Sequence, residues 1–158
     1  MPRATTNPST TVKSSAERSL QVQPYLFFEG RCEEALEFYR RALGAEVTML
    51  MRFKDCPPSD DAGMCPPAAD IGEKIMHASF RIGTTELMAS DGHCDKPANF
   101  QGFSLSLTVP TEAEADRTFT ALAEQGKVMM PLAKTFFSPR FGMLTDRFGI
   151  PWMIYVKP

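Results

Sequence analysis

The sequence predicts an α+β fold in which a strand–helix–three-strand (βαβββ) unit occurs twice along the chain. A strand, an amphipathic helix and three strand-like segments follow one another from residue 21, and the same order begins again from residue 102. Gly44 and Gly126, which end the two predicted helices, are separated by about eighty residues, and such a fixed displacement indicates an internal repeat. We therefore expect a single domain over residues 21–158, with module one at 21–91 and module two at 102–158.

The composition is that of an ordinary globular protein. The chain has 158 residues, of which 43% are hydrophobic and 23% are charged, and its formal net charge is −2. This charge offers no basic surplus for nucleic acid or for an anionic membrane, and no apolar run is long enough to span a bilayer. The four cysteines form no CxxC pair, so we expect reduced thiols and a cytoplasmic location.

Residues 1–20 differ from the rest of the chain because they carry eight Ser or Thr residues and almost no apolar ones. Such a segment cannot bury enough surface to offset the entropy of ordering it, so we expect a flexible tail. Its Arg-bearing, acid-poor composition is also that of organelle-targeting peptides, but its amphipathic pattern is weak.

The first unit contains the best-specified element of the chain. Residues 22–28 alternate as a strand, and an apolar stripe at helical spacing follows Glu29-Gly30. Acidic residues in the first turn of this helix and basic residues in its last turn suit the helix dipole, and Gly44 supplies the stop. Strand-like segments at 46–53, 74–82 and 85–90 complete the unit. Residues 54–73 contain two Cys-Pro-Pro triplets, and we expect them to form a mobile lid.

The second unit repeats this order with its own start and stop signals. Residues 103–109 alternate as a strand, and Thr111 with Glu114 fits a capping box at the start of a helix that Gly126 ends. Strand-like stretches follow at about 128–137, 140–145 and 151–156. On the strands of both units, alternate residues make one strongly apolar face and one polar face with methionines.

Three segments resemble a known family. They are PYLFFEGRCEEALEFYRRALGAE, KIMHASFRIGTTELMASD and FGMLTDRFGIPWMIYVK, and together they are similar to the PhnB-like proteins of the vicinal-oxygen-chelate superfamily, which includes glyoxalase I, bleomycin-resistance proteins and extradiol dioxygenases. The resemblance covers residues 22–157. It implies a curved mixed sheet, glyoxalase-like, whose two modules surround a cavity, and it implies a homodimer that binds a small molecule.

The resemblance also implies which positions face the cavity. The metal-ligand positions of the superfamily correspond to Gln23, Glu86, Ser104 and Met153. Serine and a thioether are poor ligands for a hard divalent cation, so we expect no resident metal and at most weak divalent binding. The substrate-binding residues expected from the same face are Gln23, Tyr25, Ser104, Ser106, Met153 and Tyr155.

His77 and Glu86 are the expected catalytic residues, because both fall on the polar face and together could form an acid–base couple. A structural role for His77 is the equal alternative. Arg81 and Arg140 could hold an anionic substrate, although surface ion pairs are the more common role for such residues. A zinc set of Cys56, Cys65, His93 and Cys94 has a spacing that matches no zinc motif.

Three functions compete at this point. The protein is an enzyme of the lyase, isomerase or dioxygenase type acting on a small polar metabolite, or it is a non-catalytic protein that sequesters a small molecule, as bleomycin-resistance proteins do. Relatives also carry the name 3-demethylubiquinone-9 3-methyltransferase. The sequence opposes that third function, because it lacks the glycine-rich turn after an early strand that a Rossmann-like fold requires.

Overall fold

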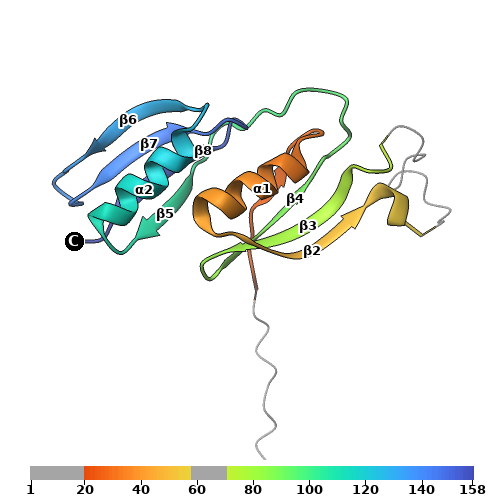
Figure 1. Cartoon of the computed structure of the whole chain (residues 1–158), viewed down its shortest axis with the longest axis horizontal. Helices are drawn as coiled ribbons and strands as arrows, with labels where there is room; N and C mark the ends of the chain where they lie inside the picture. The colour runs from red at the N-terminus through yellow and green to blue at the C-terminus, as the bar shows by residue number, and fades with distance from the viewer. Residues whose placement is uncertain (1–19, 58–70) are drawn as a thin grey trace, which may run out of the picture.

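The computed structural model describes residues 20–57 and 71–158, and it consists of two modules that each place one helix over a four-stranded sheet (Figure 1). Module one contains β1 (Tyr25–Phe27), α1 (Cys32–Leu43), β2 (Glu46–Arg52), β3 (Ile75–Ile82) and β4 (Thr85–Ser90). A short 3-10 helix, Phe53–Asp55, follows β2. The strands lie in the order β1-β4-β3-β2, with β1 parallel to β4 and the other pairs antiparallel.

Module two repeats the same architecture. It contains β5 (Leu105–Val109), α2 (Glu112–Ala123), β6 (Lys127–Ala133), β7 (Phe141–Thr145) and β8 (Pro151–Val156). The strand order β5-β8-β7-β6 corresponds strand for strand to that of module one, again with one parallel and two antiparallel pairs. The predicted α+β fold of two βαβββ units is therefore confirmed, and both helices lie on the same side of the molecule (Figure 1).

The two helices begin in different ways although both modules share one topology. Thr111 caps α2 as predicted, because its hydroxyl accepts a hydrogen bond from the Glu114 amide at 3.1 Å. The Glu114 carboxylate completes no capping box and pairs instead with Arg117. The side chain of Arg31 makes no capping bond at the start of α1, where the Asp91 carboxylate from the end of β4 accepts from the Cys32 amide at 2.7 Å.

A buried carboxylate joins the two modules. Asp146, in the turn before β8, is 3% exposed and accepts hydrogen bonds from the Tyr39 hydroxyl at 2.6 Å and from the Trp152 indole at 2.9 Å. It also accepts from the amides of Phe148 and Ile150. Burial raises the pKa of Asp146, while the hydrogen bonds act in the opposite direction. Because Tyr39 lies on α1, this group fastens module one to module two.

Several local expectations need correction. The strand predicted over 128–137 ends at Ala133, because Thr135 and Ser138 form a hydrogen-bonded turn. Cys32 and Cys94 are free, but Cys56 is disulfide-bonded, so the expectation of reduced thiols is wrong for Cys56. Residues 1–19 and 58–70 lie outside the described residues, and with them lie Cys65, nearly all of the predicted tail and most of the predicted lid.

Neither α1 nor α2, the two α-helices within the described ranges, has the length and apolar character that crossing a membrane requires.

Candidate functional site

Each sheet has one face packed under its helix and one face left open. Ala78 and Phe80 of β3, like Trp152 and Ile154 of β8, are almost completely buried on the helix side. The residues that alternate with them are only partly buried or exposed. The alternation predicted from the sequence is therefore present, and the candidate site residues lie on the open faces.

The open face of module one carries two hydrogen-bonded groups of polar side chains. The Gln23 amide donates to the Glu86 carboxylate at 2.9 Å. Farther along the strands, the Tyr25 hydroxyl lies 3.0 Å from Nδ1 of His77, and the Ser79 hydroxyl lies 3.4 Å from Nε2 of the same ring. We call Tyr25, His77 and Ser79 together the relay.

The expected pairing of His77 with Glu86 is not formed. The Cα partner of Glu86 on β3 is Arg81, which lies four residues beyond His77 along the strand. The hydroxyl of Tyr25 instead reaches His77 across β4, which lies between β1 and β3. The structure thus brings together Gln23 with Glu86 and Tyr25 with His77.

The open face of module two is less polar. Across its four strands, Ser106 pairs with Met153, Met153 with Met143, and Met143 with Met130. A second row joins Thr108, Tyr155 and Phe141, and the Tyr155 ring stacks on Phe137 with centroids 6.4 Å apart. Ser104 precedes β5, and the strand register places Ser106, not Ser104, opposite Met153.

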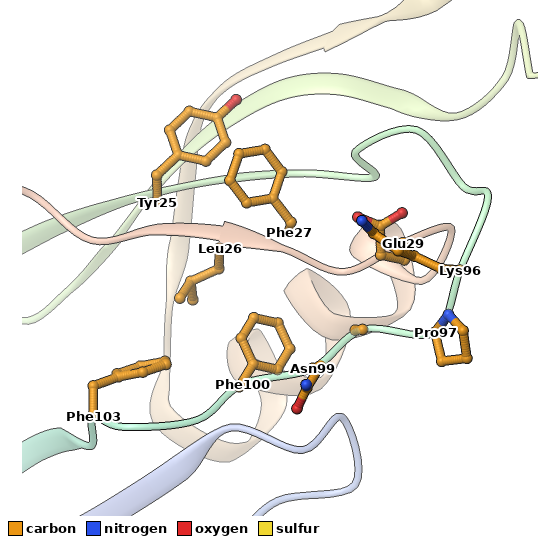
Figure 2. A pocket seen from close by; sticks show the side chains of 10 residues that line it. Tyr25, Leu26, Phe27, Glu29, Lys96, Pro97, Asn99, Phe100 and Phe103 are labelled. Atoms are coloured by element: carbon orange, nitrogen blue, oxygen red, sulfur yellow. The ribbon is translucent and has the colours of Figure 1, made fainter.

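A cavity of about 410 Å³ lies between β1 and the segment that joins the two modules (Figure 2). Figure 2 shows Tyr25 and Phe27 on one side of β1, with Leu26 on the other side facing Phe100. The polar groups of the cavity are the side chains of Glu29, Lys96 and Asn99, and the lining residues are Tyr25, Leu26, Phe27, Glu29, Lys96, Pro97, Ala98, Asn99, Phe100 and Phe103. Tyr25 therefore belongs both to the cavity and to the relay.

Sequence reasoning missed most of this cavity, because local patterns give residues 96–100 no role beyond connecting the modules. One signal in the sequence could have found it. Phe100 and Phe103 are large aromatic residues in or beside a segment that should otherwise be polar. The structure adds that Glu29 adopts a left-handed backbone with φ of 48°, which is uncommon for a residue other than glycine, and that its carboxylate accepts from the Cys94 amide at 3.0 Å.

The two arginines weighed as substrate anchors are engaged in ion pairs. Arg81 pairs with Glu46, and Arg140 pairs with Asp116 at 2.7 Å. The candidate zinc set is not assembled, because Cys56 is disulfide-bonded and the Cys94 thiol donates to the backbone carbonyl of Asp91 at 3.3 Å. Burial also raises the pKa of the Cys94 thiol, which disfavours the thiolate that a metal requires.

The donors on the open faces do not fit a hard divalent cation. The Glu86 carboxylate already accepts from the Gln23 amide, and the residues opposite each other in module two are a serine and a methionine. Within residues 20–57 and 71–158, no three side chains of His, Cys, Asp or Glu gather where they could hold a metal ion.

A chelator test follows from this donor set. We expect about 1 mM EDTA to leave the melting temperature of the purified protein unchanged, because a weakly held ion adds little stability by mass action. Differential scanning fluorimetry, paired with elemental analysis after dialysis, measures this. A stoichiometric transition metal that survives dialysis would contradict the expectation.

The fold and the open faces correspond to a known class of protein. Residues 21–154 match the Glyoxalase/Bleomycin resistance protein/Dioxygenase superfamily. The chain therefore belongs to this superfamily, and the resemblance of its three segments is confirmed.

Three proteins of known sequence or structure are similar to this chain over most of its length. Protein YjdN of Escherichia coli K12 is 39% identical over 140 residues, which is 87% of this chain and 95% of YjdN. The structure of PA1353 from Pseudomonas aeruginosa superposes with a TM-score of 0.75 at 44% identity, covering 88% of this chain and 98% of PA1353. A Bacillus cereus structure named "Putative 3-demethylubiquinone-9 3-methyltransferase, PhnB protein" superposes with a TM-score of 0.70 at 31% identity, covering 87% of this chain and 99% of that protein.

Proposed function

We propose that the protein binds a small organic molecule in the cavity between β1 and residues 96–103. The observation that carries this proposal is the lining: Tyr25 and Phe27 of β1, together with Phe100 and Phe103, border a space of about 410 Å³ that also offers a carboxylate, an ammonium and an amide. Ligand sites are typically apolar hollows of this size with a few polar groups.

Two versions of this function differ in what happens to the ligand. The relay beside the cavity supports an enzyme that moves protons on its ligand, of the lyase, isomerase or dioxygenase type expected from the sequence. The largely apolar lining, with four aromatic residues among ten, supports a protein that only sequesters its ligand. Turnover by the wild-type protein that His77→Leu abolishes would favour the enzyme. A tight ligand recovered chemically unaltered would favour sequestration.

The methyltransferase name belongs to the Bacillus cereus relative, and we do not propose that activity for this protein. Both sheets are mixed, and only one strand pair in each is parallel. A doubly wound parallel sheet with a phosphate-binding turn, which the Rossmann-like methyltransferases use, is a different architecture.

A substitution in the cavity wall tests the binding function. We expect Phe103→Ala to weaken small aromatic ligands about tenfold, because an aromatic contact of this kind contributes about 1.4 kcal/mol. Ligand-observed NMR with a library of small aromatic molecules supplies the affinities. The matched control is Phe137→Ala: the two rings are similarly exposed, at 41% and 39%, but Phe137 does not line the cavity. Equal effects of the two substitutions would argue against the cavity.

The partner we propose is a second copy of this chain. Large apolar side chains are exposed on the corresponding strands of both modules. They are Val47, Met49 and Leu50 on β2, and Val128, Met129 and Met130 on β6. Monomeric proteins rarely leave such patches uncovered. Because the two modules are related, a twofold arrangement could cover module one of each copy with module two of the other.

Light scattering at micromolar concentration is expected to give the mass of a dimer. The double change Met49→Glu with Met130→Glu should shift the protein to a monomer, because four carboxylates would enter each dimer interface. A variant carrying Glu in place of the exposed Thr120 on the helix side is the control, and it should remain dimeric. A wild-type monomer would contradict the proposal.

The cytoplasmic location expected from the sequence stays a prediction. The free thiols of Cys32 and Cys94 support it, and the disulfide at Cys56 opposes it.

A further inference from the structure

The three side chains of the relay, on the open face of module one, are linked by hydrogen bonds into one chain. Tyr25, His77 and Ser79 come from β1 and β3, and their polar atoms form a continuous chain, with 3.0 Å from the phenol to Nδ1 and 3.4 Å from Nε2 to the serine hydroxyl. Tyr25 also stacks obliquely against Phe27, with ring centroids 4.9 Å apart. The phenol is thus held between a titratable ring and an apolar one.

The geometry points to an oxyanion site: Tyr25 donates a hydrogen bond to the anionic oxygen of a planar aromatic or enolic ligand, and His77 and Ser79 position that donor. This inference rests on the proposed function, because the ligand must lie against the same β1 side chains. Phenolates and enolates are the ligand class, since the surroundings combine one strong neutral donor with aromatic surfaces.

The donors and acceptors in the hydrogen bonds among Tyr25, His77 and Ser79 can exchange roles without leaving any of these polar atoms unpaired. When the His77 proton is on Nε2, the phenol donates to Nδ1 and Nε2 donates to the serine hydroxyl. When the phenol donates to a ligand, Nδ1 must carry a proton and donate to the phenol oxygen, while the serine hydroxyl donates to Nε2. The imidazole releases its Nε2 proton to solvent and takes up one proton from solvent at Nδ1, so it stays neutral and the number of protons is unchanged.

The side chains around the relay favour donation by Tyr25 to a ligand over an ion pair between His77 and a neighbouring charge. The cross-strand neighbours of His77 and Ser79 are Met51, Met49 and Met88, which carry no charge. The charged side chains of this sheet are paired elsewhere: Arg81 binds Glu46, Arg52 binds Glu33, and Glu86 accepts from Gln23. Tyr25 is 37% exposed, so a ligand can reach its phenol without displacing another side chain.

A pair of ligands that differ only at the oxygen tests the inference. We expect 4-nitrophenolate to bind wild-type protein about 10- to 100-fold more tightly than 4-nitroanisole, because a hydrogen bond to a charged group contributes about 1.5–3 kcal/mol. Tyr25→Phe should abolish this difference and leave the affinity for 4-nitroanisole unchanged. Titrations followed by isothermal calorimetry at a pH where 4-nitrophenol is ionised provide both constants.

The matched control is Tyr155→Phe, which removes a tyrosine hydroxyl from the open face of β8 in module two and should preserve the preference. His77→Leu should reduce the preference, and His77→Gln should restore part of it, because the carboxamide can donate to the phenol oxygen. A merely structural role for His77 would change both ligands equally in both variants.

Three outcomes would overturn the inference: no preference in the wild-type protein, a preference that survives Tyr25→Phe, or one that disappears with Tyr155→Phe. If both ligands bind equally and Phe103→Ala weakens both, the cavity function stands and only the oxyanion site fails. If Phe103→Ala and Phe137→Ala also have equal effects, the proposed function fails as well.

Discussion

Replacing Asp146 by alanine is expected to lower the free energy of unfolding by about 3–5 kcal/mol. The substitution leaves four buried donors without their acceptor: the Tyr39 hydroxyl, the Trp152 indole and the amides of Phe148 and Ile150. Each unpaired buried donor costs roughly 1–3 kcal/mol, but the costs do not add fully because neighbouring groups relax. Urea unfolding followed by Trp152 fluorescence measures the loss.

Two controls separate this buried role from a loss of charge. Tyr39→Phe removes one donor and leaves Asp146 three others, so it should cost about 1–2 kcal/mol. Asp116→Ala removes a carboxylate from an exposed ion pair with Arg140 and should cost less than about 1 kcal/mol. An Asp146→Ala variant as stable as Asp116→Ala would show that the connection between the modules contributes little.

Replacing Asp91 by alanine is expected to cost about 2–4 kcal/mol. Asp91 is 1% exposed, and its carboxylate accepts from the Cys32 amide at the start of α1 and from the Ile75 amide at the start of β3, both at 2.7 Å. Its loss leaves a helix terminus and a strand terminus unsatisfied at once. Besides chemical denaturation, hydrogen exchange should show faster opening at the Cys32 amide.

The helix of module two provides the comparison. Thr111→Ala removes an ordinary cap and should cost about 1 kcal/mol, because the freed Glu114 amide can bind water. The Cys32 residue is completely buried, and its amide has no such substitute. Equal losses for Asp91→Ala and Thr111→Ala would contradict the view that Asp91 is more than a helix cap.

Much of the architecture can be predicted because it depends on short-range spacing. The apolar stripe of α1 predicts a helix that stops at Gly44, and Gly44 indeed adopts a left-handed backbone with φ of 66°. The cap at Thr111 and the two alternating faces are predictable for the same reason. Where spacing is ambiguous the prediction is wrong, as at residues 134–137, which alternate weakly and form a turn.

The sequence by itself determined the elements and the face on which each side chain lies, since periods of 3.6 and 2 residues are visible in any single segment. Only the tertiary structure decided which polar side chains meet. His77 and Glu86 share a face, yet strand register separates them and brings His77 to Tyr25, 52 residues away. Asp91 and Asp146 look like turn residues locally, but burial against distant donors makes Asp91 the junction of α1 with β3 and Asp146 the group that holds the modules together. Strand pairing and burial arise between remote segments, and no local pattern encodes them.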